Sequence, residues 1–438
     1  MTRNRGKLLL LDHFFHISER SGSLRKELLG GFTTFLAMAY IIFVNPAILS
    51  LSGMDKGALI TVTCISAALG SVLMGLFGNV PIALAPGMGL NAFFTFSLVQ
   101  GSNIPWPQVL GIVFISGIVF LILTISGLRK HIAKAIPPVI IISSTAGIGL
   151  FIALIGMKNM NLIIPDANTL VAMGSFNMSV ILGIMTLIVM MILEIRKVPG
   201  SLLIGIFFGT VMGLVTGETT LPQTLFSLPP SMAPIAFKLD IPGALKWSFF
   251  PAIFSFMFLD FFDSLATLLA CNKEIGTQNK NGEGTSLGRM LYYDAIASIF
   301  GALLGTSTVT AFIESGTGIA AGARTGLAAI VTGIFFLLAL LFTPLVAMVP
   351  AFAVAPALIM VGVLMFRSLA LLDFKDPKTS IVAFLTTVMM PFTYSISNGL
   401  TFGFLSYILL NVVTADFKKI HPVLWVIGAL CVLNIILR

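Results

Sequence analysis

The chain has 438 residues, of which 57% are hydrophobic and only 10% are charged, and its formal net charge is +8. At a mean hydropathy of +1.04, these few charges cannot cover a soluble globular protein, so the composition predicts a polytopic membrane protein. The three cysteines, Cys64, Cys271 and Cys431, are odd in number and far apart, which indicates neither a disulfide framework nor a metal cluster.

The first 28 residues are predicted to form a cytoplasmic leader with a short amphipathic stretch. Their apolar core is short, is followed by charged residues and lacks a small-residue cleavage site, which argues against a secretory signal. Beyond them, apolar runs long enough to cross a membrane as helices recur between polar segments. The uninterrupted candidates are 29–49, 59–77, 109–128, 138–157, 180–195, 201–215, 249–270, 290–304, 325–348, 352–366, 381–394 and 400–413.

Two further apolar segments, 81–98 and 306–321, are interrupted by proline or glycine, and counting both predicts fourteen crossings. The polar interval 217–246 is predicted to be an extracytoplasmic linker. It divides the crossings into two sets of seven, and an odd number per half makes two related halves an inverted repeat. The interrupted segments occupy the third place in each half. The predicted repeats are 29–216 and 247–415, and residues 91 and 314 of the interrupted segments lie 223 positions apart, close to half the chain.

The positive charges predict the orientation. Threading the chain with its N-terminus inside places 21 of the 25 Lys and Arg residues on the cytoplasmic side, as the positive-inside rule expects. Both termini are therefore predicted to be cytoplasmic, and this asymmetry accounts for the net charge without a nucleic-acid partner. The four outside lysines are Lys56, Lys158, Lys238 and Lys246. The last apolar run, 421–437 within the tail 416–438, could lie along the interface or make an additional crossing.

The interrupted segments point to a binding site. Irregular backbone at membrane depth is tolerated only where it is buried in protein or lines a cavity. Each segment is predicted to form a short extended piece that runs into a half-helix, because Pro86 and Gly87 stop one helix and the β-branched run around Thr310 favours strand geometry. Two such pieces could pair near the midplane and aim half-helix N-termini at a planar polar ligand, with Asn91 and Glu314 beside it.

Acidic residues inside apolar spans mark the same region. Asp260 and Asp263 lie three residues apart on one predicted helix face, and a charged aspartate at the centre of a span costs about 2.5–3.5 kcal/mol on insertion scales. Burial disfavours the charged form, so one or more of the acids Asp260, Asp263 and Glu314 could be protonated at neutral pH. A protonated carboxyl both donates and accepts hydrogen bonds, which suits the edge of a heterocycle and a role in proton coupling.

Structural alternatives stay open for each residue. Asp260 or Asp263 could cap a helix or pair with a Thr or an amide, Glu314 could be a helix-end carboxylate, and Asn91 could bond a neighbouring helix. Asp294, near a predicted helix start, is interpreted as structural.

Several motifs closely resemble the azaguanine-permease-like group of nucleobase:cation symporters, the bacterial adenine, guanine and hypoxanthine permeases. The resemblance covers nearly the whole chain, and the motifs are GGFTTFLAMAYIIFVNP at 30–46, ALAPGMGLNAFF at 83–94, FFDSLATL at 261–268, GTSTVTAFIESGTGIAAGARTGL at 305–327 and VGVLM at 361–365. The resemblance implies an all-α inverted repeat of fourteen helices. Its core domain would comprise helices 1–4 and 8–11 (about 29–128 and 247–348), and its gate domain helices 5–7 and 12–14 (about 137–216 and 352–415).

Carried over by motif, the resemblance implies that Asp263, Glu314 and Asn91 contact a purine, with Asp260 one turn before Asp263. Thr310, in the same motif as Glu314, is a further candidate contact, and Asp263 and Glu314 are the candidates for the coupling proton. One position departs from the family pattern: Ala266 adds a methyl group where the family usually has glycine and a close approach is expected, a difference that bears on pocket width and substrate preference.

The sequence therefore predicts a proton-driven importer of purine nucleobases in the cytoplasmic membrane that works by alternating access, with no cofactor and no metal. A homodimer is compatible with this hypothesis, and the sequence does not decide the oligomeric state. The alternatives are a carrier of uracil, xanthine or a small anion on the same fold and, in another class, a membrane-embedded enzyme. The enzyme is disfavoured because no HExxH, DDxxD or GxSxG pattern and no Cys/His pair occurs in a predicted span.

Overall fold

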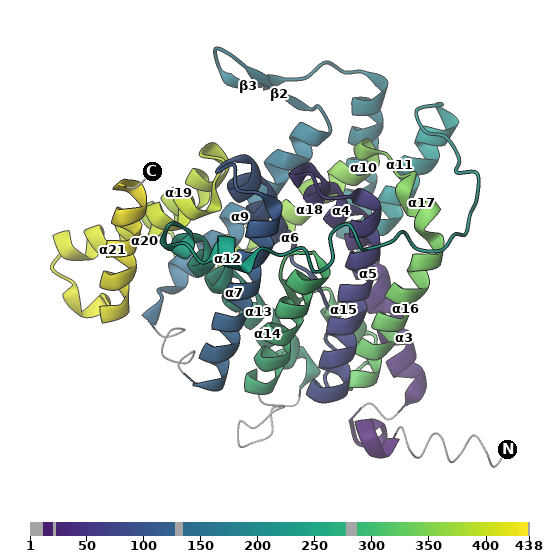
Figure 1. Ribbon diagram of the computed structural model, residues 1–438, viewed down its shortest axis with the longest axis horizontal. Helices are drawn as coiled ribbons and strands as arrows, with labels where there is room; N and C mark the ends of the chain where they lie inside the picture. The colour runs from purple at the N-terminus through teal and green to yellow at the C-terminus, as the bar shows by residue number, and fades with distance from the viewer. Residues whose placement is uncertain (1–11, 21–22, 128–134, 277–286, 437–438) are drawn as a thin grey trace.

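The computed structural model describes residues 12–20, 23–127, 135–276 and 287–436. The start of the predicted leader, the basic residues Arg129, Lys130, Lys134 and Lys280, and the final Arg438 lie outside this part. Helices run between two faces of the molecule (Figure 1). We call the face with α2 (Ile17–Arg20) the N face, at the bottom of the view, and the opposite face, from which a β-hairpin projects, the hairpin face.

In the described part of the chain, ten helical segments are long and apolar enough to cross a membrane, and each agrees with a predicted span to within a few residues. The first begins at Leu24, inside the predicted leader. The ten are Leu24–Ser52, Lys56–Gly78, Trp106–Ile125, Pro138–Asn159, Met178–Ile195, Trp247–Ile275, Leu287–Leu304, Gly326–Ala347, Ala351–Leu371 and Ile396–Val413.

The total of fourteen crossings stays a prediction. The helix α11 (Ser201–Val215) has 15 residues and α19 (Pro377–Phe392) has 16. At about 1.5 Å per residue both are shorter than a hydrocarbon core of about 30 Å. A last helix, α21 (Pro422–Ile436), follows a short polar turn.

The two interrupted segments contain strands, as predicted. The strand β1 (Leu84–Pro86) leads into α6 (Met88–Ala92), and β4 (Val309–Ala311) precedes α15 (Ser315–Ala320). The strands pair antiparallel, with Ala85 opposite Thr310, and every residue of both is buried. The predicted pairing of the two extended pieces is therefore confirmed.

The helices pack in two groups. One surrounds the strand pair, and we call it the strand group: α3 (Leu24–Met38), α4 (Ile41–Leu49), α5 (Lys56–Leu73), α6, α7 (Trp106–Ile125), α13 (Phe250–Ile275), α14 (Leu287–Leu304), α15 and α16 (Gly326–Ala339). The other, the hairpin group, is built on the pair α9 (Pro138–Asn159) and α18 (Ala351–Phe366), with α10 (Met178–Ile195), α11, α19, α20 (Ile396–Val413) and α21. Short elements join them: α12 (Ile241–Ala244) packs on α7, and α17 (Thr343–Ala347) follows α16.

One element was not expected. The strands β2 (Ile163–Asp166) and β3 (Leu170–Met173) form an antiparallel hairpin between α9 and α10, in a stretch predicted only as a connection, so the chain is not all-α. Asp166 closes the turn by accepting the backbone N–H groups of Thr169 and Asn168, both at 2.8 Å. These bonds hold the pKa of the Asp166 carboxyl below its ordinary value.

Helices α5 and α16 touch through glycine. A Cβ placed on Gly326 would lie 1.8 Å from the carbonyl oxygen of Gly75, in the π-helical turn that ends the α5 segment. We expect Gly326→Leu to destabilise the protein by more than the roughly 1–3 kcal/mol of ordinary overpacking, because backbone must move. Thermal unfolding of the purified protein in detergent measures this. Gly57→Ala is the control, since its nearest neighbours are 3.3 Å or more from the added methyl, and equal loss of stability in both variants would contradict the expectation.

Candidate functional site

The outer edge of β1 is completed by one serine. The Ser71 hydroxyl, on α5, accepts the backbone N–H of Leu84 at 3.0 Å and donates to the carbonyl of the same residue at 3.1 Å. A two-stranded sheet in a membrane has two open edges without water to bind them. Ser71 therefore takes the place of a third strand.

The outer edge of β4 is completed by α14. The Ser298 hydroxyl lies 3.1 Å from the carbonyl oxygen of Val309, and the Asp294 carboxylate accepts the N–H of Ala311 at 3.1 Å. Asp294 and Ser298 are one helical turn apart, so both face the strand. The sequence interpretation of Asp294 as a structural residue agrees with this position.

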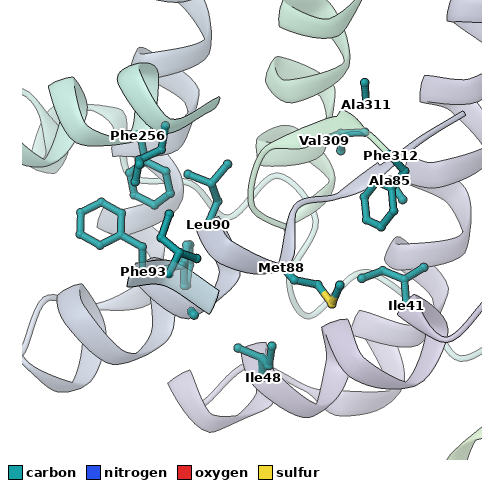
Figure 2. Close-up of a cluster of buried hydrophobic side chains, with 14 of the residues drawn as sticks. Ile41, Ile48, Ala85, Met88, Leu90, Phe93, Phe256, Val309, Ala311 and Phe312 are labelled. Carbon is teal, nitrogen blue, oxygen red and sulfur yellow. The ribbon is translucent and has the colours of Figure 1, made fainter. Parts of the chain in front are cut away.

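Apolar side chains seal both sides of the strand pair. Figure 2 shows Ala85, Val309 and Ala311 together on the strands, with Met88, Ile41 and Phe312 nearby. Phe93, which follows α6, packs against Phe256 of α13 with ring centroids 4.8 Å apart. The segment after β1 is thus fixed against α13, the helix that carries Asp260 and Asp263.

Asn91 is fully engaged in a buried network. Its amide nitrogen donates to the Asn45 side-chain oxygen at 2.5 Å, and its own oxygen accepts the Ser307 hydroxyl. Asn45 donates in turn to Thr63 at 2.6 Å and to Thr306 at 3.4 Å. The network joins α4, α5, α6 and the residues before β4. In this conformation Asn91 faces the interior of the strand group rather than a cavity.

Glu314 has a partner that the sequence analysis missed. The Tyr40 hydroxyl, at the break between α3 and α4, donates to Glu314 Oε1 at 2.6 Å. Tyr40 is fully buried, whereas Glu314 is half-buried. The bond holds the start of α15 against the first membrane segment and leaves the second oxygen, Oε2, for another partner.

Asp263 faces a pocket between the two helix groups. Its side chain is exposed there, and Glu314 lies close enough for the two charges to interact. The pocket is lined mainly by α9 and α13, with contributions from α6 and α18: Gly89, Leu90, Ile141, Ser144, Thr145, Ile148, Phe258, Leu259, Phe262, Asp263 and Met365. On α13 the residues just before Asp263 are buried, and beyond it the face with Ala266, Ala270 and Glu274 is exposed toward the N-face end.

Asp260 and Thr310 lie behind this pocket. Asp260 is 1% exposed and is hydrogen-bonded to Ser298 at 2.9 Å, so it faces α14. Thr310, the middle residue of β4, is buried and packs against Gly87. Of the five predicted contacts, Asp263 lines the pocket, and Glu314 lies near enough for its charge to act on Asp263 without lining the pocket itself. Asp260, Thr310 and Asn91 lie in the packed interior.

Four polar residues escaped the sequence analysis: Tyr40, Asn45, Ser71 and Ser298. Tyr40 and Asn45 could have been found, because both interrupt an otherwise apolar span within one quoted motif. The serines carry no such signal, since serine is common in membrane helices as a packing residue.

Together, helices of membrane-spanning length, a buried strand pair and acids beside a pocket between two helix groups define a membrane transporter rather than an enzyme. The family model described as the Permease family matches residues 25–402. The chain belongs to the Permease family.

Named relatives match over most of their length. The adenine permease AdeP of Escherichia coli (strain K12) is 41% identical over 98% of this chain and 96% of its own. The guanine/hypoxanthine permease PbuG of Bacillus subtilis (strain 168) is 41% identical over 94% of this chain and 96% of its own. Among solved structures, the transmembrane domain of the cyanobacterial bicarbonate transporter BicA matches with a TM-score of 0.66 at 16% identity, covering 87% of this chain and 97% of that one. At that identity it shows the fold alone.

The edge of β1 gives a testable prediction. Ser71→Ala removes the partner of both the N–H and the C=O of Leu84, and each unpaired buried group costs about 1–3 kcal/mol. We expect a lower thermal unfolding temperature in detergent than for the control Ser116→Ala, whose buried hydroxyl bonds only to a carbonyl of its own helix. Equal unfolding temperatures for the two variants would show that Ser71 does not support the strand pair.

Proposed function

We propose that the chain is a secondary active importer of purine nucleobases, namely adenine, guanine or hypoxanthine, driven by proton symport across the cytoplasmic membrane. The observation that carries this proposal is the position of Asp263 in a pocket near the paired strands, where the charge of Glu314 acts on it. The names of relatives that are 41% identical support the substrate class.

The chemistry of the two acids suits a purine edge. Ring N–H and amino groups donate to a carboxylate, and ring nitrogens accept from a protonated carboxyl. Two carboxyls can therefore bind both the donors and the acceptors on the edge of a purine. Asp263 and Glu314 would bind the base, and at least one would carry the coupling proton. Asp260, Asn91 and Thr310 stay predicted contacts that would need a change of side-chain position to reach the base.

The two helix groups suit alternating access. In this proposal the strand group is the core domain and the hairpin group is the gate domain. On the hairpin-face side of the pocket the groups meet through Phe96, Phe151 and Tyr394, whose rings lie 5.2–6.1 Å apart. On the other side α13 exposes one face from Asp263 to Glu274. With the N face in the cytoplasm, as the positive charges predict, this arrangement corresponds to an inward-facing state.

The acids disfavour an anion as cargo. The Asp263 carboxyl in the pocket, with Glu314 nearby, would repel a small anion, and no lysine or arginine lines the pocket among the described residues. The fold is shared with a bicarbonate transporter, but the site chemistry favours a neutral heterocycle taken up with a proton.

Neutralising the acids tests the proposal. We expect Asp263→Asn and Glu314→Gln each to abolish accumulation of labelled adenine, guanine or hypoxanthine in proteoliposomes with an imposed proton gradient, because each removes a carboxyl that binds the base or the proton. The matched control is Asp373→Asn, at an exposed acid outside the pocket. Near-normal accumulation in both pocket variants would refute the assignment, and uptake that persists with an uncoupler would indicate a facilitator.

Tyr40 gives a separate expectation. Tyr40→Phe keeps the ring but removes the donor to Glu314, so the carboxyl is no longer held in place. We expect KM for the purine to rise about tenfold, equivalent to about 1.4 kcal/mol, with a smaller change in the maximal uptake rate. The control is Tyr407→Phe, because the Tyr407 hydroxyl donates to the Lys419 carbonyl and not to Glu314. An unchanged KM in Tyr40→Phe would show that the bond does not position Glu314 for binding.

A further inference from the structure

The hydroxyl of Ser298 has two acceptors but only one hydrogen. It lies 2.9 Å from Asp260 Oδ2 and 3.1 Å from the Val309 carbonyl oxygen. A serine hydroxyl donates once and can accept as well. If Asp260 were a carboxylate, the single hydrogen could make only one full hydrogen bond, and the other acceptor would at most share it in a weaker three-centre contact.

A protonated Asp260 would supply the second hydrogen that the two contacts of Ser298 require. Its O–H then donates to Ser298 Oγ, and the Ser298 O–H donates to the Val309 carbonyl, so both contacts become hydrogen bonds. The equivalent residue at the other edge of the sheet needs no such help: Ser71 donates to one group and accepts from another. The two serines differ because Ser71 faces one donor and one acceptor, whereas Ser298 on α14 faces two oxygens, one of Asp260 and one of Val309.

The surroundings of Asp260 favour the same protonation state. Its second oxygen, Oδ1, has no hydrogen-bond partner among the described residues, and an unpaired carboxylate oxygen costs more in a dry interior than a neutral carbonyl. The charged groups that face Asp260 are both acids, Asp294 of α14 and Asp263 of α13.

We propose that Asp260 is a buried proton-binding site whose occupancy decides, through the single hydrogen of Ser298, whether the outer edge of β4 is hydrogen-bonded. When the O–H bond of Asp260 breaks, its proton passes to the carboxylate of Asp263, which is exposed at the pocket, and from there to water. The Ser298 hydrogen then turns to Asp260, and the Val309 carbonyl loses its partner.

The consequence reaches Glu314 through the backbone. Val309 begins β4, and Glu314 follows that strand immediately before α15. Deprotonation of Asp260 would therefore loosen the strand that positions the second acid of the pocket. This link to transport rests on the proposed proton symport. The Asp260 proton site does not rest on it, because binding of the proton requires no purine.

Infrared spectroscopy of the purified full-length protein in lipid, without purine, tests the site. At neutral pH, where exposed carboxyls are ionised, we expect the carbonyl absorption of a protonated carboxyl, reduced by one group per chain in Asp260→Asn and retained in Asp373→Asn. The asparagine amide still donates to Ser298, so the variant keeps the strand edge satisfied. Equal absorption in the wild type and in Asp260→Asn would overturn the proposal.

A second pair of variants covers a failure of Asp260→Asn to fold. In Ser298→Ala the protonated carboxyl loses its acceptor, so its absorption should shift, while Ser298→Thr keeps the hydroxyl and should leave the absorption in place. An absorption that is identical in the wild type, Ser298→Ala and Ser298→Thr would overturn the relay. Because no purine is present, these outcomes are independent of uptake: a chain that fails to transport purines can still show the Asp260 proton, and a purine importer can lack it.

Discussion

The structure depends on one constraint: a two-stranded sheet buried among membrane helices must have every edge group hydrogen-bonded. Water cannot reach the strands, and an unpaired backbone group there costs several kcal/mol. Side chains of the neighbouring helices meet the requirement, with Ser71 on one edge and Ser298 and Asp294 on the other. The positions of α5 and α14 beside the strands follow from this requirement.

The same constraint places acids in the interior. The edge of β4 presents an N–H group, at Ala311, and a carboxylate is a strong acceptor for it. Asp294 therefore has a structural reason to lie in an apolar helix, because it bonds backbone and is not among the residues that line the Asp263 pocket. Asp263 makes no hydrogen bond to the strand backbone in the part of the chain that the structure describes, and it is exposed at the pocket. The two aspartates thus have different roles: Asp294 completes the sheet, and Asp263 is open to a ligand.

The sequence predicted what is determined locally and missed what depends on distant contacts. Proline, glycine and β-branched residues identified both interrupted segments, and the pairing of Ala85 with Thr310 confirms the extended pieces. Spacing could not separate Asp260 from Asp263, because residues three apart differ by only about 60° around a helix. That angle is enough for one to face α14 and the other the pocket. The donor of Glu314 is Tyr40, 274 positions away, and no local pattern indicates that these two residues pair.

The buried networks explain why the proposed motion between the helix groups would leave the arrangement within the strand group intact. Within the strand group, Asn91 and Asn45 connect segments from four parts of the chain, and a fully satisfied polar network of this kind rigidifies its surroundings. Across the pocket, by contrast, the two groups meet mainly through apolar side chains such as Ile148 and Phe262, whose contacts are non-directional and can slide at small cost. In the proposed alternating-access cycle, directional bonds would keep the strand group rigid, and the non-directional contacts between the groups would let the pocket at their boundary open and close.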